Sequence, residues 1–470
     1  MGWFLTFLEG LVLFFNFIIL GYFALLNLFY IFLSIMASKQ LFKFKIRTRS
    51  RFRNMKEVPI LPSVCVLSPA YNEELTIAES LKSQLNLDYP ELEVIVINDG
   101  SRDGTLEVLK KEFKLKKTKR SPGKTLNTQK VKAVYKSKKH KNLWVLDKEN
   151  GGKADALNAG INFSRSRLFC AIDADSLLEK GALTRLVEEY LTESGDIIAL
   201  GGIIRIANDC RIKDGEVLEA KLPRKFLPAV QAVEYIRAFL CGRSGFNEIN
   251  ALLIISGAFG LFHRQTVLEV GGYRTDTVGE DMELVVRMHR KMREWNRDYK
   301  IMFIPDPVCW TQAPDDWKIL RNQRNRWQRG LIESLTLNKQ MLMNPKYGAV
   351  GMVSMPFFTL FEAAGPLFET IGYVFVILSV LMGWINIPFF FVFLSLAVVL
   401  GIILSLTSLI LEETTVKKYN NPRDLFFLVL LSIVENLGYR QLITLWRLKG
   451  TFDLIRRKKN WGQMIRKKFT

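Results

Sequence analysis

Histidine and cysteine are scarce in this chain of 470 residues, which has three histidines and five cysteines. The cysteines are isolated, odd in number and mostly placed in apolar runs: Cys65, Cys170, Cys210, Cys241 and Cys309. This pattern argues against a disulfide framework or a zinc site and predicts small buried thiols in a reducing compartment. No serine or cysteine forms an evident set with a histidine, so a nucleophile–histidine triad is not expected either.

Negative charge is also in short supply, since 46 acidic residues stand against 66 Lys and Arg, a net charge of +20. A basic chain suits nucleic acid, anionic lipid or phosphorylated ligands alike, so the location of the charge must decide. The strongly basic stretch 110–141 has almost no aromatic side chains for base stacking, which argues against a nucleic-acid partner. We expect this stretch to be a solvated, mobile loop, with contact to anionic lipid or a polyanionic product as the alternative.

Long apolar runs lie at both ends of the chain. Residues 2–37 exceed the length of about 20 that a membrane span needs, and they are too long for the apolar core of a signal peptide, about 7–15 residues. Basic residues follow directly, and the positive-inside rule makes that flank cytoplasmic. These residues are Lys39, Lys43, Lys45, Arg47, Arg49, Arg51 and Arg53.

Three further apolar segments, 356–384, 387–411 and 425–446, precede a basic tail that we also expect to be cytoplasmic. An even number of crossings must then follow the polar block, so one of the three segments is not a simple span. The first carries Glu362 and Glu369, so it is a candidate for an interfacial helix that leads into a span, or for a hairpin. The last carries Glu435 and Arg440, so it is a candidate for an interfacial helix.

The polar block between these runs alternates short β-rich apolar stretches with longer amphipathic ones. The predicted strands are residues 64–68, 94–98, 143–146, 168–173, 197–206 and 301–305. The predicted helices between them are residues 75–84, 105–113, 154–162 and 181–192. The alternation predicts an α/β domain with a mixed, mainly parallel sheet covered by helices.

Polar motifs follow three of the predicted strands. They are Ser68-Pro69-Ala70-Tyr71-Asn72-Glu73, Asn98-Asp99-Gly100-Ser101 and Asp173-Ala174-Asp175. Ligands of such sheets bind beyond the carboxyl ends of the strands, so we expect the three motifs to converge on one rim. A single aspartate after a strand is weak evidence because turns favour aspartate, but three from separate strands are harder to explain as turns alone.

Asp173 and Asp175 stand two residues apart at a strand end, so alternation would point both carboxylates the same way. Two hard oxygen ligands suit Mg²⁺ or Mn²⁺ bridging a diphosphate; the alternative is a capped turn. The run Gly151-Gly152-Lys153 opens a predicted helix and offers backbone N–H groups and a lysine to phosphate. An ordinary helix start is the equal alternative there, because the run does not have a Walker frame.

Two helical motifs complete the set. Asp281, in Gly279-Glu280-Asp281, is a candidate general base for an acceptor hydroxyl, or else a helix N-cap. The run Gln323-Arg324-Asn325-Arg326-Trp327 lies in a predicted helix whose arginines suit phosphate and whose indole suits a sugar ring. The alternative for that helix is an amphipathic element at a membrane surface.

In this order, the four runs Asn98-Asp99-Gly100, Asp173-x-Asp175, Gly279-Glu280-Asp281 and Gln323-x-x-Arg326-Trp327 resemble the signature of membrane-embedded processive family 2 glycosyltransferases. That family includes cellulose, chitin, hyaluronan and poly-N-acetylglucosamine synthases. The resemblance covers about residues 59–334 and implies a cytosolic GT-A domain. Many members have Thr-Glu-Asp in the third motif, but the base is kept here. Only a short basic tail follows the last apolar segment, so the cyclic-dinucleotide-binding barrel of bacterial cellulose synthases is not expected.

The resemblance implies a role for each candidate residue. Glu73 and Asp99 would lie by the uridine, while Lys153, Asp173 and Arg326 would serve the diphosphate. Asp173 and Asp175 would hold Mg²⁺ or Mn²⁺. Asp281 would be the base of an inverting, β-forming transfer, with Glu280 next to it. The acceptor side would comprise Gln323, Trp327 and the loop Ser256-Gly257-Ala258.

The expected organisation is a transmembrane segment (1–37), a basic cytoplasmic linker (38–58), a cytosolic GT-A domain (59–340), interfacial and transmembrane helices (341–446) and a basic cytoplasmic tail (447–470). The leading hypothesis is a plasma-membrane synthase that moves glucose or N-acetylglucosamine from a UDP-sugar to a growing polysaccharide and couples this to secretion. A non-processive transferase to a lipid or lipid-linked acceptor is the runner-up, and a receptor with a degenerate domain fits poorly because every expected acidic position is filled. The donor sugar, linkage, homo-oligomeric state and any export partner are not encoded in these motifs.

Overall fold

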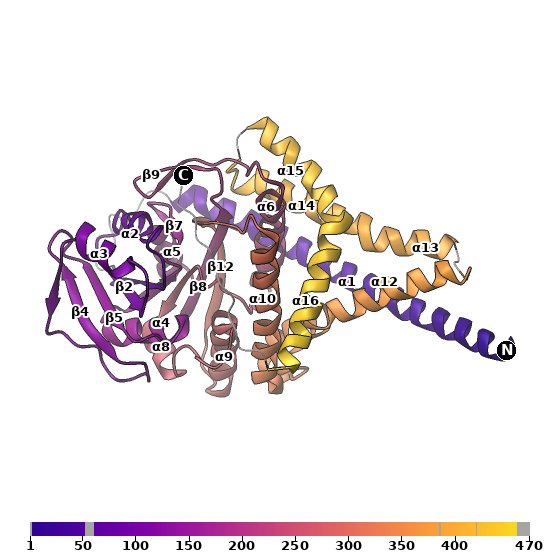
Figure 1. The fold of residues 1–470 in the computed structure, drawn as a ribbon, viewed down its shortest axis with the longest axis horizontal. Coiled ribbons are helices and arrows are strands. Elements are labelled where there is room, and N and C mark those ends of the chain that lie inside the picture. Colours follow the sequence, from indigo (N-terminus) through magenta and orange to yellow (C-terminus); the bar gives the residue numbers. More distant parts are fainter. Residues whose placement is uncertain (1, 52–60, 385–386, 420, 458–470) are drawn as a thin grey trace.

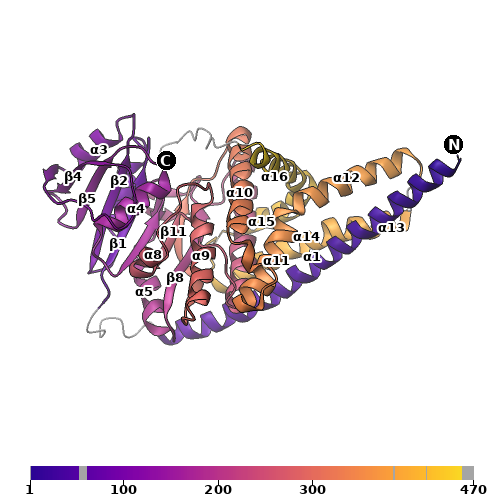
Figure 2. The same cartoon turned by 90° about the horizontal axis from the view of Figure 1, so that it is seen from below.

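A long helix and a mixed sheet dominate the computed structural model (Figure 1), which describes residues 2–51, 61–384, 387–419 and 421–457. Helix α1 (Gly2–Arg51) runs from the apolar end along one side of the molecule and, as Figure 2 shows, ends close to α5 (Ala182–Thr192). Residues 38–51 of the expected linker continue this helix without a break, and residues 52–58 lie outside the described part.

The sheet has ten strands in the order β3-β4-β5-β2-β1-β6-β11-β8-β12-β7. Neighbouring strands are parallel in the pairs β1/β2, β1/β6, β2/β5 and β8/β12, and antiparallel in the others. The strands are β1 (Val64–Ala70), β2 (Leu92–Asp99), β3 (Leu115–Thr118), β4 (Val131–Ser137), β5 (Leu143–Lys148), β6 (Leu168–Ile172), β7 (Ser176–Leu178), β8 (Ile197–Ile206), β11 (Phe259–His263) and β12 (Lys300–Thr311), with β9 (Arg211–Lys213) and β10 (Glu216–Glu219) forming a separate hairpin. All six predicted strands are present, and the predicted mixed sheet is confirmed, with parallel pairing in its longest ladders.

Helices pack on both faces of this sheet (Figure 2). They are α2 (Ile77–Leu85), α3 (Thr105–Glu112), α4 (Lys153–Phe163), α5 (Ala182–Thr192), α6 (Phe226–Ile236), the π-helical turn η2 (Arg237–Arg243), α7 (Ser244–Glu248), α8 (Arg264–Glu269), α9 (Glu280–Glu294) and α10 (Trp317–Leu337). All four predicted helices are present to within two residues at each end. The strands between them are buried along almost their whole length, as expected for a sheet covered on two sides.

The basic stretch 110–141 is not the mobile loop that its composition predicts. Its two ends form β3 and β4, which extend the sheet beyond β5 in antiparallel register. In β4, Lys132 and Lys136 are exposed, while the adjacent Ala133 and Val134 are both buried after a shift of register, so the sequence does not show a regular strand alternation. A lysine-rich edge strand also discourages pairing with another chain.

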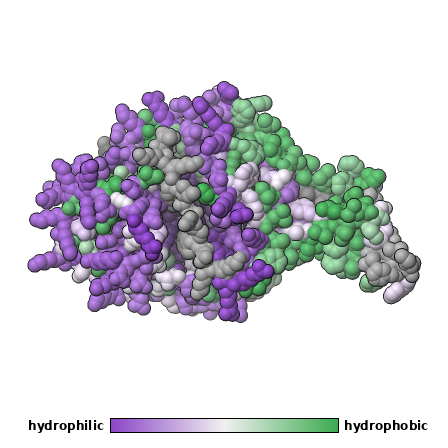
Figure 3. Space-filling view, in the orientation of Figure 1, coloured by the Kyte–Doolittle hydropathy of each residue, from purple (hydrophilic) through white to green (hydrophobic). Residues whose placement is uncertain are grey.

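After α10 the chain becomes mostly apolar. It passes through η3 (Lys339–Met341), η4 (Pro345–Tyr347), η5 (Val350–Ser354), α11 (Met355–Phe357) and η6 (Phe358–Ala363) to α12 (Gly365–Leu381), α13 (Ile387–Leu394), η7 (Ser395–Val399), α14 (Leu400–Thr415), α15 (Pro422–Val434), η8 (Glu435–Tyr439) and α16 (Arg440–Ile455). The space-filling view separates a hydrophilic body from this hydrophobic end, where α1, α12 and α13 project together (Figures 1 and 3).

Two stretches of the described chain are long and apolar enough to cross a membrane, Gly10–Arg47 and Pro422–Ile455. A bent pair, Val350–Ala363 with Gly365–Leu381, meets at 42° and adds a third candidate. The backbone is non-helical at Leu437 and Gly438, so the second stretch is two helices, and α16 packs along α10 (Figure 1). This break agrees with the expectation that one of the three C-terminal segments is not a simple span.

The second half of α1 packs against α7. Leu33 and Leu41 are buried, and the backbone of Leu33 meets Gly245 so closely that an added Cβ would lie 2.6 Å from its carbonyl oxygen. Lys43 forms an ion pair with Glu248 at 2.5 Å. The basic flank of the first span is therefore neutralised partly by acidic groups of the domain.

Candidate active site

Asp99, at the end of β2, is fully engaged with the turn that precedes α4. Its Oδ1 accepts from the Lys148 ammonium at 2.5 Å and from the Gly151 amide at 3.0 Å. Its Oδ2 accepts from the Gly152 amide at 2.8 Å and from the Asn150 side chain at 3.2 Å. The parallel register of β1, β2 and β6 brings the ends of these strands to one rim, as predicted.

Lys153 lies at the centre of the rim. Its Nζ is 2.5 Å from Asp173 Oδ1 and 3.2 Å from the carbonyl oxygen of Gly257, to which it donates, and it lies 3.8 Å from Glu280 Oε1. Burial alone would lower the pKa of Lys153, but Asp173, Glu280 and Asp281 together raise it above its ordinary value. The ammonium therefore stays charged and links the strand end of β6 to the start of α9.

Asp281 is held by the loop that the resemblance placed on the acceptor side. Its Oδ2 accepts from the Gly257 amide at 3.0 Å, and its Oδ1 accepts from the Met282 amide at 2.8 Å. The N-cap of α9 is Gly279, so Asp281 lies within the first turn and the N-cap alternative does not apply. Ser256 lies in the same loop and accepts from the Phe259 amide through its carbonyl oxygen at 3.0 Å.

Burial raises the pKa of the Glu280 carboxyl to about 7, with Asp281 adding to the rise and Lys153 and Arg326 opposing it. Arg326 of α10 is therefore close enough to Glu280 to act on its charge.

Burial also lowers the pKa of the Arg243 guanidinium to about 10, and Asp281 is the main group that opposes this shift. The guanidinium of Arg243 stacks on the Phe239 ring at 3.7 Å, within the π-helical turn η2.

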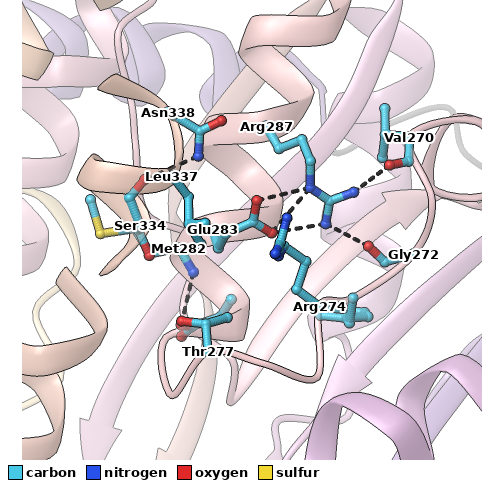
Figure 4. A network of polar contacts seen from close by, with 12 residues as sticks. Val270, Gly272, Arg274, Thr277, Met282, Glu283, Arg287, Ser334, Leu337 and Asn338 are labelled. Atoms are coloured by element: carbon cyan, nitrogen blue, oxygen red, sulfur yellow. Dashed lines mark hydrogen bonds and ion pairs between the residues drawn. The ribbon is translucent and has the colours of Figure 1, made fainter. Parts of the chain in front are cut away.

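A polar network stabilises the loop that leads into α9 (Figure 4). Arg287 pairs with Glu283 at 2.8 Å and donates to the backbone carbonyls of Val270 and Gly272. Thr277 donates to Glu333 of α10 at 2.7 Å. The position of Asp281 is thus fixed both by the loop before α9 and by α10.

Helices α9 and α10 meet at two glycines. A Cβ on Gly330 would lie 2.7 Å from the Cα of Gly279, closer than side chains are found in proteins. The Gly-Glu-Asp form of the third motif therefore lets α10 approach the start of α9 directly, which brings Arg326 towards Glu280.

The motif on α10 has two faces. Trp327 is 44% exposed, with the Arg324 guanidinium 4.4 Å from its ring centroid. Arg324 itself is buried and pairs with Glu234 of α6 at 2.8 Å, so it is a structural arginine. Gln323 is half-buried, and its Oε1 has no hydrogen-bond partner among the described residues.

The other face of α10 is bound to α16. Asn325 donates to Asp453 at 2.9 Å, and Arg447 donates to Gln328 at 2.9 Å. Gly450 sits against the backbone of Asn325, where an added Cβ would lie 2.8 Å from its carbonyl oxygen. Helix α10 therefore carries its motif on one face and packs against α16 with the other.

The described part of the chain contains no group of three or more His, Cys, Asp or Glu side chains arranged to hold a metal ion. Asp175 is buried, and the Asp173 carboxylate is about one-third exposed at the rim. A pair of carboxylates still fits Mg²⁺ or Mn²⁺, because such ions commonly take one or two carboxylates and complete their shell with water and substrate phosphate. Glu73 is buried near this rim, and its Oε2 accepts from Thr76 at 2.7 Å.

Three further candidate residues were not identified from the sequence, namely Lys148, Arg243 and Arg287. Lys148 is fully buried, but nothing in the sequence distinguishes it from the many exposed lysines. Arg243 belongs to a π-helical turn, which hydrophobic periodicity does not predict. Arg287 lies four residues after Glu283 on the same helix, and this ion-pair spacing was the one available signal. The five cysteines are free and buried, as predicted.

The fold and the rim together define a GT-A glycosyltransferase, an enzyme class that uses nucleotide-activated sugars. The model for "Glycosyl transferase family group 2" matches residues 168–406, just over half of the chain, and the model for "Glycosyl transferase family 2" matches residues 65–226. The chain therefore belongs to the family 2 glycosyltransferases.

Curated relatives include two poly-beta-1,6-N-acetyl-D-glucosamine synthases. The one from Staphylococcus epidermidis is 30% identical over 273 residues, which is 58% of this chain and 55% of the relative. The one from Staphylococcus aureus (strain COL) is 29% identical over 276 residues, 58% of this chain and 56% of the relative. This chain thus matches about half the length of these relatives.

Among solved structures, the mannosyltransferase PcManGT from Pyrobaculum calidifontis, determined in complex with GDP-Man and Mn²⁺, aligns with a TM-score of 0.50. The alignment covers 92% of this chain and 100% of that one at 16% identity. At this identity the likeness supports the shared fold.

Proposed function

We propose that this enzyme transfers N-acetylglucosamine from UDP-N-acetylglucosamine to the hydroxyl of a growing polysaccharide at a membrane, with inversion at the anomeric carbon. The observation that carries this proposal is a continuous chain of contacts across the rim. Asp173 meets Lys153, Lys153 meets the Gly257 carbonyl, and the Gly257 amide meets Asp281. The diphosphate end and the base end of one reaction centre are thereby joined through a single loop.

In this proposal Asp281 accepts the proton of the acceptor hydroxyl as its oxygen bonds to the anomeric carbon and the bond to the donor diphosphate breaks. Two hydrogen bonds from backbone amides orient the Asp281 carboxylate, and this leaves it further lone pairs for the acceptor. Lys153 and Arg326 bind the diphosphate, because a cation at the leaving group stabilises the charge that develops there.

Asp173 and Asp175 are the residues that would hold Mg²⁺ or Mn²⁺. Such an ion would neutralise charge on the departing nucleoside diphosphate. Glu73 lies at the uridine end, where Asp99 holds the Gly151–Gly152 turn. Gln323, Trp327 and the loop of Ser256 and Gly257 form the acceptor side, since an exposed indole can stack on a sugar ring.

A polar row between the apolar helices supports a processive reaction with export of the product. Glu362 meets Tyr30 of α1 at 3.1 Å and Arg447 of α16 at 3.0 Å, and Glu369 accepts from Thr444 at 2.6 Å. Ionisable groups at membrane depth commonly line a path. This row continues from the α10 face next to Trp327, through the contact of Gln328 with Arg447. By the positive-inside rule, we place the catalytic domain in the cytosol at the plasma membrane.

A panel of UDP-sugars, given to the purified protein in lipid with Mg²⁺ or Mn²⁺, tests the proposal. We expect UDP-N-acetylglucosamine to give the fastest UDP release and a product whose mass grows by many sugar units. Addition of a single sugar to a lipid would instead establish the non-processive alternative. UDP release from UDP-glucose alone would show that the donor is UDP-glucose and not UDP-N-acetylglucosamine.

A further inference from the structure

A buried lysine at the end of β5 lies behind the donor rim. Lys148 has no exposed surface, and its Nζ donates to Asp99 Oδ1 at 2.5 Å, pairs with Asp155 Oδ1 at 2.6 Å and donates to the Glu149 carbonyl at 2.6 Å. A buried charge is tolerated only when it is paired and hydrogen-bonded, and three acceptors use all three N–H groups of an ammonium. The ends of the paired strands β2 and β5 and the first turn of α4 therefore meet at one side chain.

The two carboxylates that flank Lys148 shape the turn of Gly151 and Gly152. Asp99 accepts from both glycine amides, as described above. Asp155 lies against Gly151, where an added Cβ would come within 2.5 Å of its carboxyl carbon, and it also accepts from the Gln129 amide at 3.0 Å. Gly152 has a φ of +88°, a conformation that side chains disfavour.

The residue after this turn is Lys153, whose ammonium lies 2.5 Å from Asp173 Oδ1. The conformation of the turn therefore sets where Lys153 points. The four hydrogen bonds that Asp99 accepts occupy the lone pairs of its carboxylate, so its contribution to the donor site is made through the turn.

We propose that Lys148 is a positioning residue of the donor site: through Asp99 and Asp155 it holds the Gly151–Gly152 turn and so aims Lys153 at the donor diphosphate. The inference rests on the proposed function for the identity of the donor. Without Lys148, two carboxylates would face each other in a buried space with no cation between them, and the turn would open to relieve their repulsion.

The test compares Lys148→Met with Lys138→Met, which removes an exposed lysine from the turn between β4 and β5. UDP affinity is measured by calorimetry, and KM and kcat with the donor sugar. We expect Lys148→Met to raise both the Kd for UDP and the KM at least tenfold, and to lower kcat as well, because a misplaced Lys153 also stabilises the leaving diphosphate less. Lys138→Met should match the wild type. An unchanged Kd and KM with only a lower melting temperature would show a purely structural role and overturn the proposal.

Two further measurements keep the outcome decisive. If Lys148→Met does not fold, the double variant Lys148→Met/Asp155→Asn restores the net charge of the cluster, and it should still bind UDP at least tenfold more weakly than Asp155→Asn alone. Equal affinity of these two variants would overturn the proposal.

If the wild type itself does not bind UDP, the proposed donor is wrong. The positioning role of Lys148 is then tested separately, by amide hydrogen exchange at residues 151–154. Faster exchange in Lys148→Met than in Lys138→Met supports the positioning role, and equal exchange contradicts it.

Discussion

At the scale of single residues, the acidic motifs are interleaved with cations. Lys148 stands between Asp99 and Asp155, and Lys153 stands between Asp173 and Glu280. An opposite charge a few ångströms away offsets the repulsion that a row of carboxylates would otherwise create. Each of these carboxylates therefore has a cationic neighbour.

Removal of divalent metal should stop turnover, because Asp173 and Asp175 would then have no ion to share with the donor diphosphate. We expect an excess of chelator to lower UDP release at least tenfold and added Mn²⁺ or Mg²⁺ to restore it. The measurement is UDP release by the purified enzyme before chelation, after it and after the metal is restored. Full activity in excess chelator would refute the role of the two aspartates.

Glu280 predicts a pH dependence of stability. Its pKa in the folded protein, about 7, lies above the ordinary value of 4.5, so folding favours the neutral form. The cost of ionising it in the folded state is absent below about pH 4.5 and is complete above pH 7. We therefore expect Glu280→Gln to melt higher than the wild type at about pH 8 and at nearly the same temperature at about pH 5. A difference that is equal at the two pH values would contradict this assignment.

Which residues the sequence could predict depended on the type of signal. Asp173, Asp281 and Arg326 belong to short sequence motifs, which can be recognised without knowledge of how the chain packs. Lys148 and Arg243 gain their meaning from burial, which depends on strands and turns that are remote in the chain. A lysine in a chain with 66 basic residues carries no signal of its own.

At the scale of elements, apolar patterns predicted the central strands well and charged ones poorly. Strands β1, β2 and β6 read as buried β structure, and the structure confirms this. Strands β3 and β4 were missed because they carry exposed lysines and show no regular alternation. The C-terminal part of α1 resembled a linker, yet packing of Leu33 and Leu41 and the pairing of Lys43 with Glu248 keep it helical.

The importance of the close contact between α9 and α10 can be tested by adding one methyl group at Gly330. Gly330→Ala would place a Cβ 2.7 Å from the Gly279 Cα and force the two helices apart. Overpacking of this kind costs roughly 1–3 kcal/mol. Because Asp281 and Arg326 lie on the two separated helices, we also expect the transfer rate to fall at least tenfold.

The matched control for this contact is Gly21→Ala in α1, where an added Cβ meets no atom within 4 Å. Melting temperature and UDP release are measured for both variants. Normal activity of Gly330→Ala would show that the close approach of the two helices is not needed for catalysis.

At the scale of the whole molecule, a hydrophilic body and a projecting apolar end divide the chain into a catalytic part and a membrane part (Figure 3). The sequence predicted this division from hydropathy alone. The broken stretch of α15 and α16 was harder to predict, because composition does not reveal the non-helical backbone at Leu437 and Gly438. The long contact of α16 with α10 then joins this apolar end to the helix that carries Gln323, Arg326 and Trp327.

Topology can be read with engineered cysteines, because all five native thiols are buried. Met382 lies exposed at the end of α12, and Lys141 lies exposed beside β5. With the catalytic domain in the cytosol, a membrane-impermeant thiol reagent should label Met382→Cys in intact cells, and Lys141→Cys only after permeabilisation. Labelling of Lys141→Cys in intact cells would place the catalytic domain outside.

The central claim, that these motifs form one transferase centre with Asp281 as its base, is tested most directly by Asp281→Asn. The amide keeps the size of the side chain and can still accept from the Gly257 amide, but it cannot take up the acceptor proton. We predict that transfer from the donor sugar falls below detection while UDP binds with an affinity within about threefold of the wild type. Retained transfer, or loss of UDP binding in this variant, would contradict the account.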